Sequence, residues 1–382
     1  AGVGVMFYLL LAVRALMRVQ GAFVARHEPN LAELLDLVAL GTVADMVPLD
    51  FNNRVLVEAG LRRIRTGRAA PGIRALIAIS GRHAEYLRSA DLGFALAPRV
   101  NAAGRLQDMS LGITCLLSRD IECAHEHAQV LERINQERRE LQSSMQAEAE
   151  DMVAAVGDNG ATGVVLFDPD WHLGVIGLVA SRVKERLHRP VVALARSTDG
   201  SGCLNGSARS IPGFHIRDAL AELDACHPGL LRRFGGHAMA AGLVVHSDDL
   251  ARFRSSFDAI VCQRIDTASL QPVLWTDGEL AAGECDLDLA RQLRWAGPWG
   301  QDFPEPLFDN VFERYAWKVM AERHLRLDLR DPRDGSRLQA VMFNAYAGVP
   351  PPSRMQVAYT LGTDTWHGRE KPRLLVAQMA AV

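Results

Sequence analysis

The chain has 382 residues, 48% of them hydrophobic and 23% charged, which is the composition of a soluble globular protein with enough material for two or three domains. Its formal net charge of −3 excludes a global basic field, so any binding of nucleic acid has to depend on local basic clusters. The six cysteines are far apart and form no C-x-x-C pair, which argues against a disulfide framework or a zinc site and suits a reducing cytoplasm.

The first residues lack an initiator methionine and the layout of a signal peptide. The apolar run Met6–Met17 contains Arg14 and is too short to span a bilayer. We expect Val3–Gln20 to form a buried helix and Asn30 to cap the helix that follows. We also expect the chain to begin inside a domain, as a piece of a longer protein.

An aspartate interrupts the apolar segment Gly41–Leu49. A buried carboxylate has to be paired or bound to a metal ion, so Asp45 is a candidate metal ligand. The alternative interpretation is a capping or turn aspartate shortly before Pro48. The residues alone leave both interpretations open.

The segment Arg99–Arg105 reads as a small, polar turn with an arginine at each end. Asn101 and Gly104 are either ordinary turn residues, or the turn directs Arg105 at a phosphate. The sequence does not decide between these two interpretations.

Ile121–Val156 has apolar side chains at helical spacing and charged residues between them. This pattern predicts one amphipathic helix, roughly 50 Å long. Because that length exceeds the length of an ordinary core helix, we interpret the helix as a strut between two domains. Gly157–Gly160 would end it.

An α/β unit follows this helix. The strands Gly163–Phe167 and Val191–Leu194 flank the helix Val175–Leu187, which predicts a parallel pair of strands. Trp171 and His172 lie in the first strand-to-helix turn, where α/β sheets usually bind ligands. A turn tryptophan that packs on the helix is the alternative.

Two further stretches suggest an anion-binding surface. Gly206–Ser210 reads as a short polar strand, and Gly235-Gly236-His237 reads as a loop that lets backbone N–H groups approach a ligand. The remaining elements expected in this region are the helix Ile216–Leu223, the strand Ala240–Val245 and the helix Leu250–Ile265.

Short alternating segments replace this pattern after about residue 270, and they predict a five-stranded oligonucleotide-binding (OB) barrel. One helix, Leu287–Trp295, interrupts them. The expected strands are Val273–Trp275, Phe312–Val319, Leu325–Leu329, Leu338–Phe343, Gln356–Leu361 and Arg373–Val376. Five aromatic residues either stack on bases or belong to the barrel core: Trp317, Phe343, Tyr346, Tyr359 and Trp366.

The motifs together resemble the RecJ family of single-strand-specific DNA exonucleases, within the DHH phosphoesterase superfamily. The segments that carry the resemblance, in the family's order, are Gly41–Leu49, Arg99–Arg105, Trp171–Gly177, Gly206–Ser210, Phe234–His237 and Ala296–Phe308. The resemblance covers essentially the whole chain, and ordered motifs are far more specific than any single one.

The resemblance implies an α/β multidomain fold. Its parts would be the C-terminal part of a DHH domain (residues 1–118), a long connecting helix (119–157), a DHH-associated α/β domain (158–268) and an OB-fold β-barrel (269–382).

The resemblance also implies a chemistry. RecJ-like enzymes hydrolyse phosphodiesters from a 5′ end with two divalent ions, Mn²⁺ or Mg²⁺. Asp45 would supply carboxylate oxygen to the metal. The phosphate would be held by Asn101, Arg105, Ser207, Arg209 and Gly236, and His237 would also stabilise the transition-state oxyanion.

One departure from the family pattern affects the expected activity. The family's other metal ligands lie in an Asp-x-Asp and an Asp-His-His motif upstream, and neither motif precedes Gly41–Leu49 here. One carboxylate cannot hold a two-metal site. We therefore expect this chain alone to be inactive and the longer parent protein to be the nuclease, acting in DNA repair and recombination.

Two other functions remain open: a non-catalytic module that binds single strands, and a phosphodiesterase for cyclic dinucleotides or very short oligonucleotides. Relatives of the second kind generally lack a barrel. The expected partners are single-stranded DNA, a single-strand-binding protein and a helicase, for a cytoplasmic monomer without membrane contact.

Overall fold

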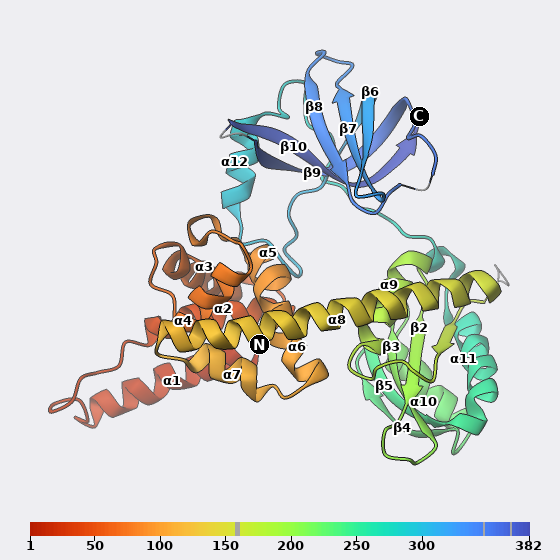
Figure 1. Cartoon of the computed structure of the whole chain (residues 1–382), viewed down its shortest axis with the longest axis horizontal. Coiled ribbons are helices and arrows are strands. Elements are labelled where there is room, and N and C mark those ends of the chain that lie inside the picture. Colours follow the sequence, from red (N-terminus) through yellow and green to blue (C-terminus); the bar gives the residue numbers. More distant parts are fainter. Residues whose placement is uncertain (157–160, 347, 367–368) are drawn as a thin grey trace. The chain divides into compact units, whose positions relative to one another are not determined.

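The computed structural model describes residues 1–156, 161–346, 348–366 and 369–382 (Figure 1). It divides into two compact units, one formed by Ala1–Ala97 with Leu274–Val382 and the other by Pro98–Val273.

The first unit begins with helices. They are α1 Gly2–Val19, α2 Leu35–Ala44, α3 Phe51–Arg65, α4 Pro71–Ile79 and α5 Ser89–Asp91, with short turns of 3-10 helix at Leu31–Leu34 and Ala84–Tyr86 and of π-helix at Leu92–Leu96. Asn30 caps the turn before α2 as predicted, because its side chain accepts the N–H of Ala32 at 3.3 Å.

Helix α1 is largely exposed, so the prediction of a buried helix is wrong. Only Gly4 and Phe7 are buried, and Phe7 packs against Val38 and Leu56. The helix extends beyond the Met6–Met17 run. Among the described residues, it is the one helix that is long and apolar enough to cross a membrane on length and composition alone.

The second part of this unit is a closed five-stranded barrel, as predicted. Its strands are β6 Phe308–Met320, β7 His324–Arg330, β8 Arg337–Met342, β9 Arg354–Trp366 and β10 Arg369–Ala381, in the order β10-β8-β7-β6-β9. β8 and β10 are parallel, and the other neighbouring strands are antiparallel. Helix α12, Leu287–Ala296, precedes the barrel, whereas Val273–Trp275 is not a strand.

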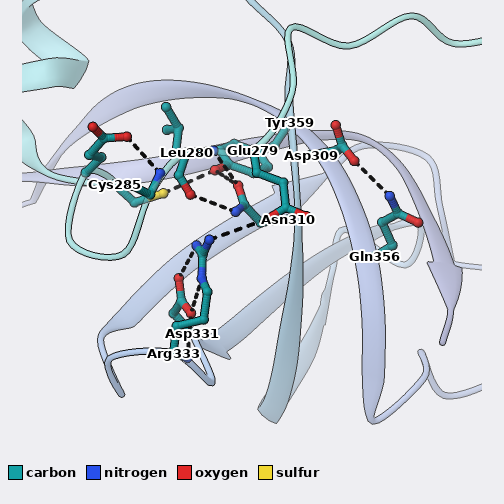
Figure 2. A network of polar contacts seen from close by, with 11 residues as sticks. Glu279, Leu280, Cys285, Asp309, Asn310, Asp331, Arg333, Gln356 and Tyr359 are labelled. Carbon is teal, nitrogen blue, oxygen red and sulfur yellow. Dashed lines mark hydrogen bonds and ion pairs between the residues drawn. The ribbon is translucent and has the colours of Figure 1, made fainter.

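A polar network fastens the segment before α12 to the barrel (Figure 2). The Tyr359 hydroxyl lies 2.7 Å from Asn310 Oδ1 and 3.1 Å from Cys285 Sγ. Asn310 exchanges two hydrogen bonds with the backbone of Leu280. Tyr359 is thus a buried, hydrogen-bonded core residue, and burial raises the pKa of its hydroxyl.

The other candidate base-stacking residues divide between core and surface. Trp317 and Tyr346 pack on the barrel core, with ring centroids 6.1 Å apart. Phe343 is exposed. The side chain of Trp366 lies outside the described residues.

The second unit is built on a sheet in the order β1-β2-β3-β5-β4. The strands are β1 Val164–Phe167, β2 Val191–Arg196, β3 Cys203–Arg209, β4 Leu231–Gly236 and β5 Ala240–His246. The helices are α6 Ala97–Leu106, α7 Ser110–Leu117, α8 Ile121–Val156, α9 Ile176–Leu187, α10 Ile216–Cys226 and α11 Leu250–Arg264. β1 and β2 are parallel, as the predicted crossover requires.

Alternate residues of β2 assign the helices to the two faces of this sheet. Val191 and Ala193 belong to the core that contains residues of α8 and α9, whereas Val192 and Leu194 belong to the core under α10 and α11. The sheet is therefore covered on both faces.

Two local predictions in this unit are wrong. The segment expected as a turn at Arg99–Arg105 lies in helix α6, because its small residues Ala102 and Ala103 are buried in helical packing. Gly235 and Gly236 end the strand β4 rather than forming a loop. The residues expected to end α8, Gly157–Gly160, lie outside the described residues.

Candidate phosphate-binding site

Two polar side chains on the central strand β3 face helix α9. Ser207 pairs with Ala193, so it lies on the side of the sheet that α8 and α9 cover, and Arg209 lies two residues further on the same face. The Arg209 guanidinium donates to Ser207 Oγ and to the Ala208 carbonyl oxygen, both at 2.8 Å. These bonds fix the guanidinium beside the hydroxyl.

The first turn of α9 approaches this pair at Gly177. A β-carbon there would lie 2.8 Å from Nη2 of Arg209 and 3.0 Å from Oγ of Ser207. The unpaired N–H groups and the dipole at a helix N-terminus favour an anion. Glycine thus lets the start of the helix come close to two side chains, each of which has hydrogen-bond donor groups that an anion could accept from.

A second arginine reaches the same region from α6. Nη1 of Arg105 donates to the carbonyl oxygen of Gly174 at 3.1 Å. Burial lowers the pKa of Arg105, and the pKa of Arg209 is lowered first by burial and then by the charge of Arg105. Within the described ranges, neither guanidinium forms an ion pair with a carboxylate. An external anion would relieve this concentration of positive charge.

Sequence reasoning missed a third arginine, Arg138, on α8. It donates to Gln142 Oε1 at 2.7 Å and to Asn135 Oδ1 at 2.8 Å. Its pKa is lowered by burial first and then by neighbouring arginines, one of which is Arg105. The one sequence signal was Asn135, a polar residue that is buried on the apolar side of the helix.

Glycines keep the surface beside Ser207 free of side chains. On strand β5, Gly242 pairs with Ser207 on one side and with Gly235 on the other. The two stretches that the sequence analysis joined therefore lie in one sheet, with one strand between them.

The turn after β4 presents His237. Gly236 has a φ of 149°, and a β-carbon there would lie 2.4 Å from the Ala240 carbonyl oxygen, so only glycine fits. The His237 N–H donates to the same oxygen at 2.8 Å, and its side chain is exposed. Asn101 lies one helical turn before Arg105 on α6 and is half-buried.

Trp171 is a packed turn residue, since it is buried and its indole Nε1 donates to Glu148 Oε2 of α8 at 2.8 Å. His172 is exposed, and its Nδ1 accepts the N–H of Gly174 at 3.0 Å.

Asp45, in the other unit, is exposed at the C-terminal end of α2. The buried carboxylate of this region is instead Asp36, which lies 3.7 Å from Arg63 and accepts the N–H of Ala70 at 2.7 Å. No group of three or more His, Cys, Asp or Glu residues able to hold a metal ion occurs among the described residues. Mg²⁺ prefers six oxygen ligands, so the residues described here do not by themselves fit a two-metal centre.

Comparison with known families assigns a class to this architecture. Residues 153–263 match the DHHA1 domain, and residues 276–378 match the RecJ OB domain. The second unit thus contains a DHHA1 domain, and the barrel is an OB fold of the RecJ type, as predicted.

Whole-chain relatives then identify the family. The chain is 49% identical to the single-stranded-DNA-specific exonuclease RecJ of Dickeya dadantii, over 99% of this chain and 67% of that protein. It is 46% identical to the Escherichia coli protein of the same name, over 98% of this chain and 66% of that protein. The chain belongs to the RecJ family, and it spans about two thirds of the length of these two relatives.

Solved structures agree with this assignment. The structure of Thermus thermophilus RecJ in complex with Mg²⁺ matches 96% of this chain and 54% of that protein, with a TM-score of 0.77 and 28% identity. The same protein in complex with Mn²⁺ matches with a TM-score of 0.76.

Proposed function

We propose that this chain is part of a 5′-to-3′ single-stranded-DNA exonuclease and that it binds the phosphates of the DNA substrate. The observation that supports this role most directly is the pair Arg105 and Arg209, which lie near each other beside the start of α9 and have no ion-paired carboxylate among the residues that the structure describes. Such a site fits phosphate, which offers several acceptor oxygens to planar guanidinium groups.

Each predicted site residue has a role in this proposal. Arg105, Arg209 and Ser207 hold the phosphate. Asn101 assists from α6, and Gly236 leaves space for the sugar–phosphate backbone of the DNA. His237, exposed at the end of the same sheet, donates to the oxyanion of the transition state. Arg138 adds positive charge from α8.

The metal chemistry belongs to the whole protein. RecJ of Thermus thermophilus has been solved with Mg²⁺ and with Mn²⁺, and two such ions activate water and stabilise the leaving oxygen in enzymes of this kind. Asp45 would be this chain's ligand. Because the described residues offer no complete ligand set, we propose no catalytic step for this chain alone.

The incomplete ligand set also favours a second candidate, in which the chain by itself is a module that binds single strands without cleaving them. A phosphodiesterase for very short substrates is less consistent with the chain, because an OB barrel serves to hold longer strands.

For the whole protein we propose a cytoplasmic monomer that acts in repair and recombination, with a single-strand-binding protein and a helicase as partners. All six cysteines are free thiols, as a reducing compartment requires.

Separate assays of binding and cleavage test the proposal. This chain should bind a single-stranded oligonucleotide with an affinity that falls steeply as salt rises, and the full-length protein should digest it with Mn²⁺. Processive digestion by this chain alone would contradict the proposal that cleavage needs metal ligands from the rest of the protein. Binding that is insensitive to salt would contradict the phosphate contacts.

A further inference from the structure

A row of aromatic and arginine side chains lies on the first unit and includes none of the phosphate-binding residues, which belong to the second unit. Tyr86 and Trp295 are 55% and 46% exposed. The guanidinium of Arg294 lies over both rings, 5.8 Å from the centroid of Tyr86 and 5.5 Å from that of Trp295. We call these three residues, with Arg65, the aromatic–arginine row.

The arginine at the end of the row holds the indole in place. The Arg65 guanidinium lies 4.9 Å from the centroid of Trp295. Arg65 is itself fixed, because it donates to the Leu87 carbonyl oxygen at 2.9 Å and to Glu58 Oε1 at 3.2 Å. Half of the indole nevertheless remains accessible, so an ordered aromatic surface is available to a ligand at little entropic cost.

The row carries positive charge that other groups only partly compensate. Arg294 donates to Thr363 Oγ1 at 3.2 Å, and its buried Nε has no hydrogen-bond partner among the described residues. Arg88, Arg294 and Trp295 line one small pocket of about 30 Å³. In the part of the chain that the structure describes, neither Arg88 nor Arg294 has an ion-paired carboxylate.

Of the acidic residues near the row, two form ion pairs with arginines outside it and one is half-buried. Asp91 pairs with Arg82 at 3.4 Å, and Glu370 pairs with Arg291 at 2.7 Å. Glu305 lines the pocket and is half-buried, and this burial raises the pKa of its carboxyl although Arg88 opposes that shift.

The geometry points to a second contact surface for single-stranded DNA, in which unpaired bases stack on Tyr86 and Trp295 while Arg294 and Arg88 face the phosphates. Stacking is tolerant of sequence because every base has a π-face, and it is available only to bases that are not already stacked in a duplex. This surface would therefore favour single strands whatever their sequence. The inference rests on the proposed function in taking single-stranded DNA as the ligand, but it concerns residues outside the phosphate-binding site.

Oligonucleotide binding to this chain, measured by fluorescence anisotropy without metal, tests the inference. Trp295→Ala and Tyr86→Ala should each weaken binding of a single-stranded oligonucleotide by about ten-fold. Trp275→Ala is the matched control, because Trp275 is 86% exposed, belongs to the same unit and lies outside the row. It should bind as the unsubstituted chain does. Trp295→Phe, which keeps an aromatic face, should retain most of the affinity. The thermal denaturation of Trp295→Ala, measured beside that of the unsubstituted chain, shows whether its loss of affinity comes from unfolding.

An abasic strand of the same length separates stacking from charge. The unsubstituted chain should bind it less well than the normal strand, and Trp295→Ala should cause no further loss. Normal affinity of both alanine variants for the normal strand would overturn the inference, and would favour an acidic peptide as the occupant, while leaving the phosphate-binding proposal intact. An equal loss on normal and abasic strands would also overturn it. A chain that binds neither strand would contradict the proposed function as well.

Discussion

Arg105 and Arg209 place two positive charges near each other beside the start of α9, and the surroundings destabilise the charged form of both guanidinium groups. Burial lowers the pKa of both guanidinium groups, and the charge of Arg105 lowers the pKa of Arg209 further. A bound anion would stabilise two such charges. Their unfavourable electrostatic free energy in the free protein is therefore an indication of an anion-binding site.

Replacing Arg209 should leave the free protein nearly as stable as before. Arg209→Ala removes hydrogen bonds to Ser207 and Ala208 but also removes a half-buried like charge. The free energy of unfolding should change by less than about 1 kcal/mol. Urea denaturation with and without inorganic phosphate measures this. Phosphate should stabilise the unsubstituted chain and not the variant, and a large loss of stability without phosphate would indicate a structural arginine instead.

A substitution at Gly177 should weaken phosphate binding although both arginines are retained. In Gly177→Ala the new β-carbon would meet Arg209 Nη2 at 2.8 Å, so the guanidinium has to move. Affinity for a single strand should fall several-fold although alanine is the better helix former. Gly4→Ala in α1, where nothing lies within 4 Å of the new carbon, controls for helix propensity. Equal affinities of the two variants would remove Gly177 from the site.

The Trp171–Glu148 hydrogen bond should stabilise the second unit by attaching the β1–α9 turn to α8. Trp171→Phe leaves a small cavity and removes the donor to Glu148, so the free energy of unfolding should fall by about 1–3 kcal/mol. Glu148→Gln keeps an acceptor oxygen and should cost less. Thermal denaturation of both variants decides this, and a larger loss in Glu148→Gln would contradict the assigned hydrogen bond.

The Asp331–Arg333 pair predicts a pH dependence of barrel stability. Hydrogen bonds from Arg333, 2.7 Å and 3.0 Å long, lower the pKa of the buried Asp331 carboxyl. A lowered pKa in the folded state contributes stability above the unfolded value of 3.8, and this contribution is lost as the pH falls through the folded value.

Asp331→Asn should therefore destabilise the barrel by about 1–3 kcal/mol at neutral pH. The difference should shrink as the pH falls below 3.8 and vanish once the pH lies below the lowered pKa of the folded carboxyl. Denaturant titrations across this range measure it. Glu313→Gln breaks a more exposed pair with Arg330 and should cost less than about 1 kcal/mol. A difference for Asp331→Asn that persists in acid would mean that the carboxylate charge is not its cause.

Elements with long, regular patterns were predictable from the sequence, and those set by tertiary contacts were not. The bounds of Ile121–Val156 are as predicted, because its apolar stripe is a local pattern of the sequence. The helix around Asn101 was missed, since alanine and glycine carry little pattern and their burial depends on neighbours far along the chain. The exposure of α1 could not be read from its apolar composition.

The candidate site shows the same division. The placement of Ser207 and Arg209 on one face of a strand was predictable from their alternation, whereas their role in a site stays a prediction. The pairing of Gly242 with both Ser207 and Gly235 brings the two glycine-rich stretches into one sheet. Arg138 was not predictable, because its approach to Arg105 follows from how α8 packs rather than from any motif.

The salt dependence of single-strand binding tests the central claim, that the arginines beside α9 bind DNA phosphate. The logarithm of the affinity of this chain for a 5′-phosphorylated single strand should fall linearly with the logarithm of salt concentration. In Arg209→Ala the slope should decrease by about 0.7, the value expected for one lost phosphate contact on a single strand. An unchanged slope and an unchanged affinity in Arg209→Ala would contradict the account.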